Sequence, residues 1–341
     1  MPAHPADFRD AIILTGPTGS GKSTLALGLA EYLNAEIIAC DSMTLYRGMN
    51  IGTAKPSAAD RARVPHHLVD VIDPWESVSV AWWLDRAADA VRDITGRRKV
   101  PLIVGGTPFY LKALLFGLFE GPPADHKLRE QLEADAAMHG PEALHARLVE
   151  VDPVVGAKLH PNDVRRVVRA LEVFQLTGKP MSEWQTQWST APLSPPFQGG
   201  VGEGGSEPPT LLGDPPLPLP KREGIRDRNQ TAIYCLDIAR EVLYERINRR
   251  VEIMVEAGWL DEVRQLRSLP QPLSREASQA LGYPEMAAVL DRKMKIEDAV
   301  ALVQQKTRQF AKRQFTWFRH LPGLQMVSPE LTFTEWRLRI Q

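Results

Sequence analysis

A glycine-rich stretch near the start of the chain has the residue types and spacing of a phosphate-binding loop. It matches the pattern G-x-x-x-x-G-K-[ST] and consists of Gly16, Pro17, Thr18, Gly19, Ser20, Gly21, Lys22 and Ser23. Its backbone N–H groups and the side chain of Lys22 would bind phosphate oxygens, and the hydroxyl of Ser23 would hold Mg²⁺. The loop therefore predicts a ligand with a di- or triphosphate group, but it does not specify a reaction.

The segments on both sides of the loop support this interpretation. An apolar run at 11–14 predicts a strand before the loop, and residues 22–33 predict a helix after it. A glycine turn that merely contains a lysine would require neither element, so we favour the phosphate loop. Strand, loop and helix in this order favour a doubly wound parallel α/β sheet, in which ligands bind at the carboxyl ends of the strands.

Two more predicted strands end in polar residues that could reach this ligand. The strand at 35–40 is followed by Asp41, and the strand at 100–104 is followed, after two glycines, by Thr107. At the carboxyl edge of a parallel sheet both side chains would lie beside the phosphate loop. Asp41 could equally cap the start of a helix, and its place in the sequence does not separate the two roles.

The composition is that of a globular chain without a strong overall charge. The chain has 341 residues, of which 43% are hydrophobic, and this length is compatible with about two domains. Its net charge of −1 means that any nucleic-acid-binding surface would have to be local. The two cysteines form no metal or disulfide pattern, and no apolar run approaches the roughly 18 residues that span a bilayer. We expect a soluble, cytoplasmic protein without a signal peptide.

Changes in composition along the chain predict four segments. Residues 1–117 and 231–341 would form the two parts of a P-loop core, the second of which ends in a basic helix. Residues 118–188 keep helical spacing without a strand and would form an inserted helical domain. Residues 189–230 are rich in proline and glycine, and we expect them to be disordered because they cannot bury enough apolar surface.

The predicted helical domain carries a cluster of arginines. Asp163 is placed to cap a helix that contains Arg165, Arg166 and Arg169. A solvated charged face is the usual role of such residues. The absence of an acidic residue before Glu172 favours a contact with phosphate groups of a nucleic acid.

The last long helix combines basic and aromatic residues. Arg308, Lys312 and Arg319 fall on one stripe of this helix, next to an apolar stripe that includes Phe315 and Phe318. The apolar stripe is typical of packing against a core. The basic stripe would then be free to meet RNA phosphates.

Several motifs resemble those of the bacterial tRNA dimethylallyltransferases, also called tRNA isopentenyltransferases. Residues 41–56 read D-S-x-x-x-Y-x-G-x-x-I-G-T-A-K-P, and residues 312–319 read K-R-Q-x-T-W-x-R. The match continues in residues 64–70, 104–114, 240–250 and 279–286. The resemblance runs from about residue 11 to residue 319, and only the Pro/Gly-rich segment interrupts it.

The resemblance implies transfer of a dimethylallyl group from dimethylallyl diphosphate to N6 of the adenosine at tRNA position 37, beside the anticodon. Asp41 would accept a proton from this amine, or align it, and Thr107 would orient the reacting atoms. Lys22, Arg250 and Mg²⁺ on Ser23 would stabilise the departing diphosphate, and Arg246 would add a further contact to it.

The resemblance also implies a set of tRNA contacts that grip the anticodon stem-loop from two sides. The expected contacts are Asp41, Ser42, Met43, Thr44, Leu45, Thr107, Arg129, Arg165, Arg166, Val167, Val168, Arg169, Gln279, Ala280, Leu281, Gly282, Tyr283, Pro284, Lys312, Arg313, Gln314 and Arg319. The target adenine would leave its stack to enter the site. We expect the enzyme to act as a monomer.

Three other functions are compatible with a phosphate loop. A relative of the cytokinin-forming enzymes would prenylate free AMP, but it is expected to lack much of the helical insertion and the basic terminal helix. A small-molecule kinase would be more compact, at roughly 200 residues. An RNA-binding protein could use the loop only to bind a regulatory nucleotide.

Overall fold

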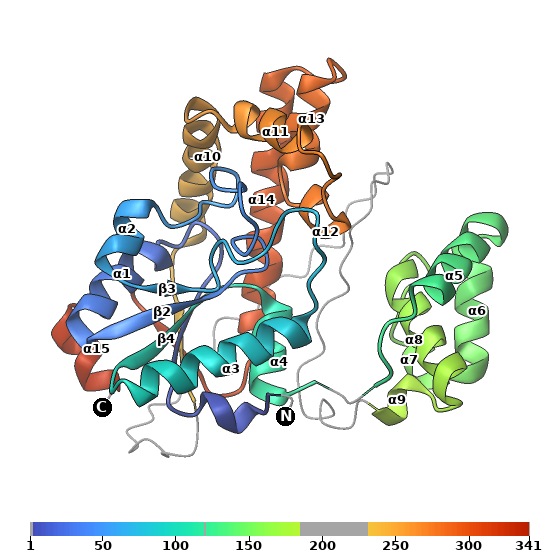
Figure 1. The fold of residues 1–341 in the computed structure, drawn as a ribbon, viewed down its shortest axis with the longest axis horizontal. Coiled ribbons are helices and arrows are strands. Elements are labelled where there is room, and N and C mark those ends of the chain that lie inside the picture. The colour runs from blue at the N-terminus through green and yellow to red at the C-terminus, as the bar shows by residue number, and fades with distance from the viewer. Residues whose placement is uncertain (1–2, 119–120, 185–230, 341) are drawn as a thin grey trace, which may run out of the picture. The chain divides into compact units, whose positions relative to one another are not determined.

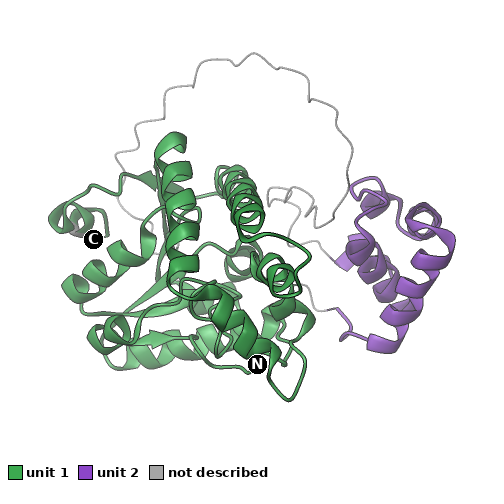
Figure 2. Ribbon diagram, turned by 90° about the horizontal axis from the view of Figure 1, so that it is seen from above, with its two compact units in different colours: residues 1–118, 190–193, 228–341 green, residues 119–189, 194–227 purple. Residues whose placement is uncertain are grey.

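The computed structural model describes residues 3–118, 121–184 and 231–340. The segment 189–230, for which we expected disorder, lies outside the described residues. The described residues belong to two compact units, one built on a sheet and one made of helices (Figure 2).

The sheet unit contains a parallel sheet of six strands in the order β3-β2-β4-β1-β5-β6 (Figure 1). The strands are β1 (Ile12–Thr15), β2 (Ala35–Cys40), β3 (His66–His67), β4 (Val100–Gly105), β5 (Ala232–Leu236) and β6 (Leu324–Val327). This arrangement confirms the predicted α/β fold with a doubly wound parallel sheet. The short outer strands β3 and β6 were not predicted.

Helices cover both faces of the sheet and extend beyond its carboxyl edge (Figure 1). The helices of this unit are η1 (Pro5–Phe8), α1 (Lys22–Leu33), α2 (Ala58–Arg63), α3 (Val80–Gly96), α4 (Pro108–Phe116), α10 (Arg240–Glu256), α11 (Trp259–Arg267), α12 (Arg275–Ser278), α13 (Tyr283–Leu290), α14 (Ile296–Phe318) and α15 (Phe333–Ile340). Connections between parallel strands must cross over the sheet, and helices are the usual crossovers.

Successive residues of the strands are buried on opposite faces of the sheet. Ile13 of β1 belongs to a core shared with Trp83 of α3, whereas Ile12 and Leu14 belong to a second core with Leu29 of α1. Because both faces are covered, the strands are apolar at nearly every position, as is typical of buried parallel sheets. The two cores fix the direction in which each strand end presents its loop.

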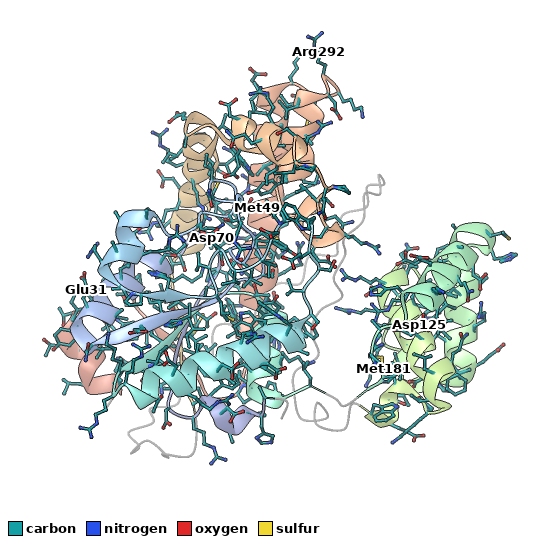
Figure 3. All side chains as sticks on the ribbon, viewed as in Figure 1. Glu31, Met49, Asp70, Asp125, Met181 and Arg292 are labelled. Atoms are coloured by element: carbon teal, nitrogen blue, oxygen red, sulfur yellow. The ribbon has the colours of Figure 1, made fainter. Side chains whose placement is uncertain are left out.

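The helical unit has a core of its own. Its helices are α5 (His126–His139), α6 (Pro141–Val151), α7 (Pro153–Gly156), α8 (Val164–Thr177) and α9 (Met181–Trp184). Leu132, Leu148 and Leu171 are buried together in this core. Asp125, labelled in Figure 3, begins α5 by accepting a hydrogen bond from the backbone N–H of Leu128 at 3.0 Å.

A buried carboxylate on α11 holds the loop that follows β2. Glu262 accepts hydrogen bonds from the backbone N–H groups of Asn50 and Ile51 at 2.7 Å and of Gly52 at 3.2 Å. The hydroxyl of Tyr283 donates to the same carboxylate at 2.8 Å. Four donors therefore converge on one side chain, and they join α11 and α13 to the loop.

Replacing Glu262 with glutamine should destabilise the fold. The amide retains one acceptor oxygen but turns its own N–H donors toward backbone donors, so buried groups lose their partner. We expect the free energy of unfolding to fall by about 1–3 kcal/mol, measured by urea denaturation with circular dichroism. Glu256→Gln, at an exposed position of α10, is the matched control and should leave stability unchanged. Equal stability of the two variants would contradict the assigned role of Glu262.

Candidate active site

The phosphate loop lies at the centre of the carboxyl edge of the sheet, between the end of β1 and the start of α1. Gly19 and Gly21 adopt φ angles of 83° and 87°, which side chains rarely adopt. A Cβ atom on Gly19 would also lie 2.9 Å from Ile247 of α10. The backbone N–H groups in the first turn of α1 have no helical acceptor, so they can bind an anion.

Lys22 lies in this loop, where the protein does little to stabilise its positive charge. Its ammonium group donates a hydrogen bond to the carbonyl of Pro17 at 3.1 Å. Burial and the nearby guanidinium of Arg250 lower the pKa of Lys22 to about 8, although the carboxylate of Asp41 acts in the opposite direction. A bound diphosphate would supply the missing negative charge, so the site favours an anionic ligand.

Helix α10 places two arginines beside the loop. Arg246 and Arg250 are four residues apart and share one face of the helix. The guanidinium of Arg250 donates to the hydroxyl of Thr18 at 3.3 Å, and burial lowers the pKa of Arg250. A guanidinium nitrogen of Arg246 lies 3.6 Å from the position that a Cβ on Gly21 would occupy. Both predicted diphosphate contacts therefore lie at the loop.

The pairing of β2 with β4 brings Asp41 and Thr107 together. Cys40 is paired with Gly105, so the residues after these two strands emerge side by side. The hydroxyl of Thr107 accepts a hydrogen bond from the backbone N–H of Ser42 at 3.2 Å. The structure thus brings Asp41 and Thr107 to neighbouring strand ends, where the hydroxyl of Thr107 bonds to the residue after Asp41.

Asp41 also forms the local turn that the sequence left open as an alternative. One carboxylate oxygen accepts hydrogen bonds from the backbone N–H groups of Met43 at 2.8 Å and Thr44 at 3.4 Å. The other oxygen has no hydrogen-bond partner in the described part of the chain. One oxygen can therefore fix the turn while the other receives a proton, so the two interpretations are compatible.

The residues after Asp41 differ in what they can offer to a substrate. Ser42 and Met43 are partly exposed, whereas Thr44 is 6% exposed and Leu45 is fully buried in the main core. The side chain of Leu45 therefore cannot line the path of a base in this structure. Only its backbone remains a candidate contact.

In the helical unit, two of the predicted tRNA-binding arginines are engaged by a buried carboxylate. Arg129 forms two hydrogen bonds of 2.9 Å with Glu172, and Arg169 forms one of 2.6 Å with the same group. Although burial acts in the opposite direction, the hydrogen bonds from Arg129 and Arg169 lower the pKa of Glu172 below its ordinary value. This cluster stabilises the unit, and its arginines are only partly available to RNA.

The start of α8 differs from its predicted form. Asp163 occupies the cap position, but its side chain makes no cap hydrogen bond and instead lies 3.4 Å from Arg166. Val167 and Val168 are buried in the core of the unit, so their side chains cannot contact tRNA directly. Arg165 is exposed and remains a candidate contact.

Only some of the predicted tRNA contacts in the turn between α12 and α13 are accessible to a substrate. Gln279 and Pro284 are exposed and Leu281 is partly exposed, whereas Ala280 and Tyr283 are buried. Gly282, between them, has a φ of 91°, and a side chain there would overlap the ring of Trp259. The turn can therefore contact a substrate through its exposed residues and its backbone.

Helix α14 directs its residues to different environments. Lys312 and Arg319 are exposed, and Arg313 is partly exposed with its guanidinium 6.0 Å from the ring centre of Phe310. Gln314, in contrast, is buried at 3% exposure. The prediction of a direct tRNA contact by the Gln314 side chain therefore does not agree with its position.

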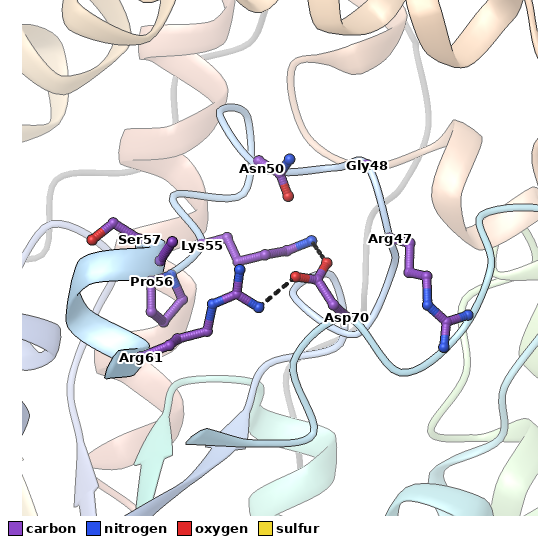
Figure 4. A pocket seen from close by; sticks show the side chains of 9 residues that line it. Arg47, Gly48, Asn50, Lys55, Pro56, Ser57, Arg61 and Asp70 are labelled. Atoms are coloured by element: carbon purple, nitrogen blue, oxygen red, sulfur yellow. Dashed lines mark hydrogen bonds and ion pairs between the residues drawn. The ribbon is translucent and has the colours of Figure 1, made fainter. Parts of the chain in front are cut away.

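The loop after β2 also borders a pocket of about 510 Å³ (Figure 4). The pocket is lined by Arg47, Gly48, Asn50, Lys55, Pro56, Ser57, Ala58, Arg61 and Asp70. Asp70 accepts hydrogen bonds from Lys55 at 2.5 Å and from Arg61 at 2.7 Å. Because these cations are already paired, we assign no anionic ligand to the pocket.

Sequence reasoning did not find three buried carboxylates that organise the two units. Glu36, Glu172 and Glu262 are each less than 10% exposed. Glu36 lies on β2 and contacts Arg97, Lys99 and His67. The only local signal was the spacing of Arg169 and Glu172 on one helix, because the other partners are distant in the sequence.

The described residues give two further results that bear on function. They contain no group of three or more His, Cys, Asp or Glu side chains that could hold a metal ion on its own. None of the helices described is both long enough and apolar enough to cross a membrane.

Comparison with known proteins gives consistent matches along the chain. Residues 44–321 match the model of the family described as IPP transferase. The tRNA dimethylallyltransferase of Geobacter metallireducens is 43% identical over 308 residues, which cover 90% of this chain and 89% of that protein. The enzyme of the same name from Geobacter sulfurreducens is 41% identical over 322 residues, which cover 94% and 93% of the two chains.

Solved structures of related proteins have the same fold. The full-length tRNA isopentenylpyrophosphate transferase of Bacillus halodurans is 35% identical, with a TM-score of 0.61 over 97% of this chain and 93% of that one. A eukaryotic dimethylallyltransferase acting on tRNA is 28% identical, with a TM-score of 0.68 over 96% of this chain and 75% of that one. The match to the family model and the identity to curated relatives lead to one conclusion: this chain belongs to the IPP transferase family.

Proposed function

We propose that this enzyme transfers a dimethylallyl group from dimethylallyl diphosphate to N6 of the adenosine at tRNA position 37, next to the anticodon. One observation carries the proposal. Asp41 and Thr107 lie at neighbouring strand ends beside a phosphate loop, and two arginines of α10 lie next to the same loop. A diphosphate in the loop would present its attached carbon chain to a base held near these two side chains. The names of the relatives agree with this activity.

The reaction forms one bond and breaks one. The N6 amine attacks the first carbon of the dimethylallyl group, and the bond from this carbon to the diphosphate oxygen breaks. Diphosphate leaves with the electron pair of that bond. The proton that N6 loses passes to the free carboxylate oxygen of Asp41, while the hydroxyl of Thr107 helps to align the amine.

Positive charge in the site stabilises the leaving group. Lys22, Arg246 and Arg250 surround the loop, and the backbone N–H groups at the start of α1 add partial positive charge. All of these groups interact more strongly with free diphosphate than with its ester, because charge develops on the departing oxygen. The site would therefore assist departure of diphosphate, and the acceptor assay below separates this reaction from transfer of a phosphoryl group.

The residues of the loop fit a magnesium ion that is held together with the substrate. Ser23, the second residue of α1, is exposed, and the described residues supply no group of three or more His, Cys, Asp or Glu side chains for a metal ion. This donor set suits Mg²⁺, which usually keeps several waters and binds through few protein ligands plus substrate phosphates. When bound, the ion would neutralise charge on the diphosphate, and Ser23 would hold it.

Recognition of tRNA would combine phosphate contacts with an unstacked base. The candidates that are exposed at least in part are Asp41, Ser42, Met43, Thr107, Arg129, Arg165, Arg166, Arg169, Gln279, Leu281, Pro284, Lys312, Arg313 and Arg319. They lie in the two units and would contact the anticodon stem-loop, whose splayed bases suit such recognition. We propose that the enzyme acts as a monomer in the cytoplasm, where its tRNA substrate is found.

One assay with separate acceptors tests the proposed activity. The purified protein is incubated with labelled dimethylallyl diphosphate and Mg²⁺, and with either unmodified tRNA or AMP. We expect label to appear in tRNA at the adenosine beside the anticodon, and not in AMP. Label in AMP alone would indicate an adenylate isopentenyltransferase. Transfer of phosphorus from γ-labelled ATP to an acceptor, with no use of the prenyl donor, would indicate a kinase.

Asp41→Asn separates the two roles of this side chain. The amide oxygen can still accept hydrogen bonds from Met43 and Thr44, so the turn is kept, but the amide cannot accept the proton. We expect the single-turnover rate to fall by about two to four orders of magnitude, with tRNA affinity unchanged within a few fold. Asp10→Asn, at an exposed position, is the control. A rate near that of the wild type would mean that Asp41 only forms the turn.

The lowered pKa of Lys22 predicts how substrate binding depends on pH. The free enzyme loses the positive charge of Lys22 as the pH rises through about 8, and with it part of the attraction for diphosphate. We expect kcat/KM for dimethylallyl diphosphate to decrease above this pH. Lys22→Arg, which stays charged, should be less active but should show no such decrease. If the profiles of the two proteins had the same shape, another group would be responsible.

A further inference from the structure

The amide of Gln314 connects α14 to two parts of the active site. Its oxygen accepts a hydrogen bond from the backbone N–H of Thr18, in the phosphate loop, at 2.8 Å. Its nitrogen donates to the carbonyl of Gly106, at the end of β4, at 2.7 Å. The side chain is 3% exposed, so these contacts are shielded from solvent. The oxygen and the nitrogen of the amide therefore each make one hydrogen bond.

Each of these partners lies next to a residue of the proposed chemistry. Gly106 directly precedes Thr107, and the hydroxyl of Thr18 accepts a hydrogen bond from Arg250. The approach is close, because a Cβ atom on Gly106 would lie 2.8 Å from both the nitrogen of Gln314 and the carbonyl oxygen of Gly16. The end of β4, the phosphate loop and α14 are therefore in contact through one amide.

A glutamine suits this place because it supplies one donor and one acceptor. Thr18 presents an N–H group and Gly106 presents a carbonyl, and a buried backbone group without a partner is costly. An acid would place negative charge against the carbonyl and near the diphosphate. An apolar side chain would leave both backbone groups without partners.

We propose that Gln314 is a positioning residue of the transfer reaction. Its amide keeps the loop that binds diphosphate in register with the strand end that carries Thr107, so that the prenyl carbon and the amine meet at the correct distance. Gln314 acts through these two backbone segments and does not touch tRNA. This inference rests on the proposed function.

The same helix also carries the proposed tRNA contact Lys312, and the proposed contact Arg319 directly follows its last residue; both are exposed. One helix therefore holds residues of two kinds, some facing outward to the macromolecular substrate and one facing inward to the diphosphate loop. The inward contact fixes α14 to the reaction centre. A tRNA bound along this helix would thus be positioned relative to the diphosphate, because the helix is hydrogen-bonded to the loop that binds the diphosphate.

Gln314→Met tests the proposal because it retains the length of the side chain and removes both hydrogen bonds. We expect KM for dimethylallyl diphosphate to rise and kcat to fall, with a combined loss in kcat/KM of about 10- to 100-fold. Calorimetry should show weaker binding of dimethylallyl diphosphate in the absence of tRNA. The Kd for tRNA should stay within about twofold, since the expected loss comes from misplacement of the reacting groups. Gln309→Met, at an exposed position of the same helix, is the control.

A double-mutant comparison distinguishes positioning from a general loss of stability. Combined with Thr107→Val, Gln314→Met should cost less than the sum of the two separate effects, because both act at the end of β4. Combined with Arg319→Ala, the effects should add. Additive losses in both combinations would overturn the proposal.

Gln314→Glu provides a second variant if the methionine protein does not fold. It retains the acceptor for Thr18 but places negative charge beside Gly106, so KM for dimethylallyl diphosphate should rise with an unchanged Kd for tRNA. Weaker tRNA binding with unchanged diphosphate binding in either variant would overturn the proposal and indicate a direct RNA contact. Absence of transfer by the wild type would refute the proposed function. Transfer by the wild type, with variants that behave like the control, would refute only the role of Gln314.

Discussion

The parallel pairing of β1, β2 and β4 is the constraint on which the active site depends. The sheet places the ends of these three strands side by side, although they are separated by up to about ninety residues along the chain. The backbone N–H of Thr107 donates to the carbonyl of Cys40 at 3.3 Å, and a side chain at Gly105 would overlap that carbonyl. The candidate catalytic residues thus stand at fixed distances because their backbones are joined to the sheet.

The charges of the site are arranged for a ligand that brings its own negative charge. In the absence of such a ligand, burial lowers the pKa values of both Lys22 and Arg250. The carboxylate of Asp41 raises both pKa values and so partly offsets the burial. Buried carboxylates elsewhere are treated differently: Glu36 and Glu172 each contact two or more basic groups. The charges of Glu36 and Glu172 are therefore neutralised within the protein, whereas those at the loop would be balanced by the substrate.

The sequence predicts features that depend on local patterns. The phosphate loop, the strands β1, β2, β4 and β5, and the junction of Asp41 with Thr107 follow from motif, periodicity and the rule for strand ends. The four donors on Glu262 could not be predicted, because they lie about 20 to more than 200 residues from it. The pairing of Arg129 and Arg169 with Glu172 could not be predicted in full either, because Arg129 lies 43 residues from Glu172 in the sequence.

Gln314 shows why a motif alone does not indicate which way a residue faces. Its neighbours Lys312 and Arg313 are basic, so the pattern K-R-Q-x-T-W-x-R favours a surface that binds RNA. A helix has an inner and an outer face, however, and successive residues point about 100° apart. The same short run can therefore contribute a cation to the outside and an amide to the interior. Its contact with Thr18 spans 296 residues, so only the folded chain shows that the glutamine belongs to the phosphate loop.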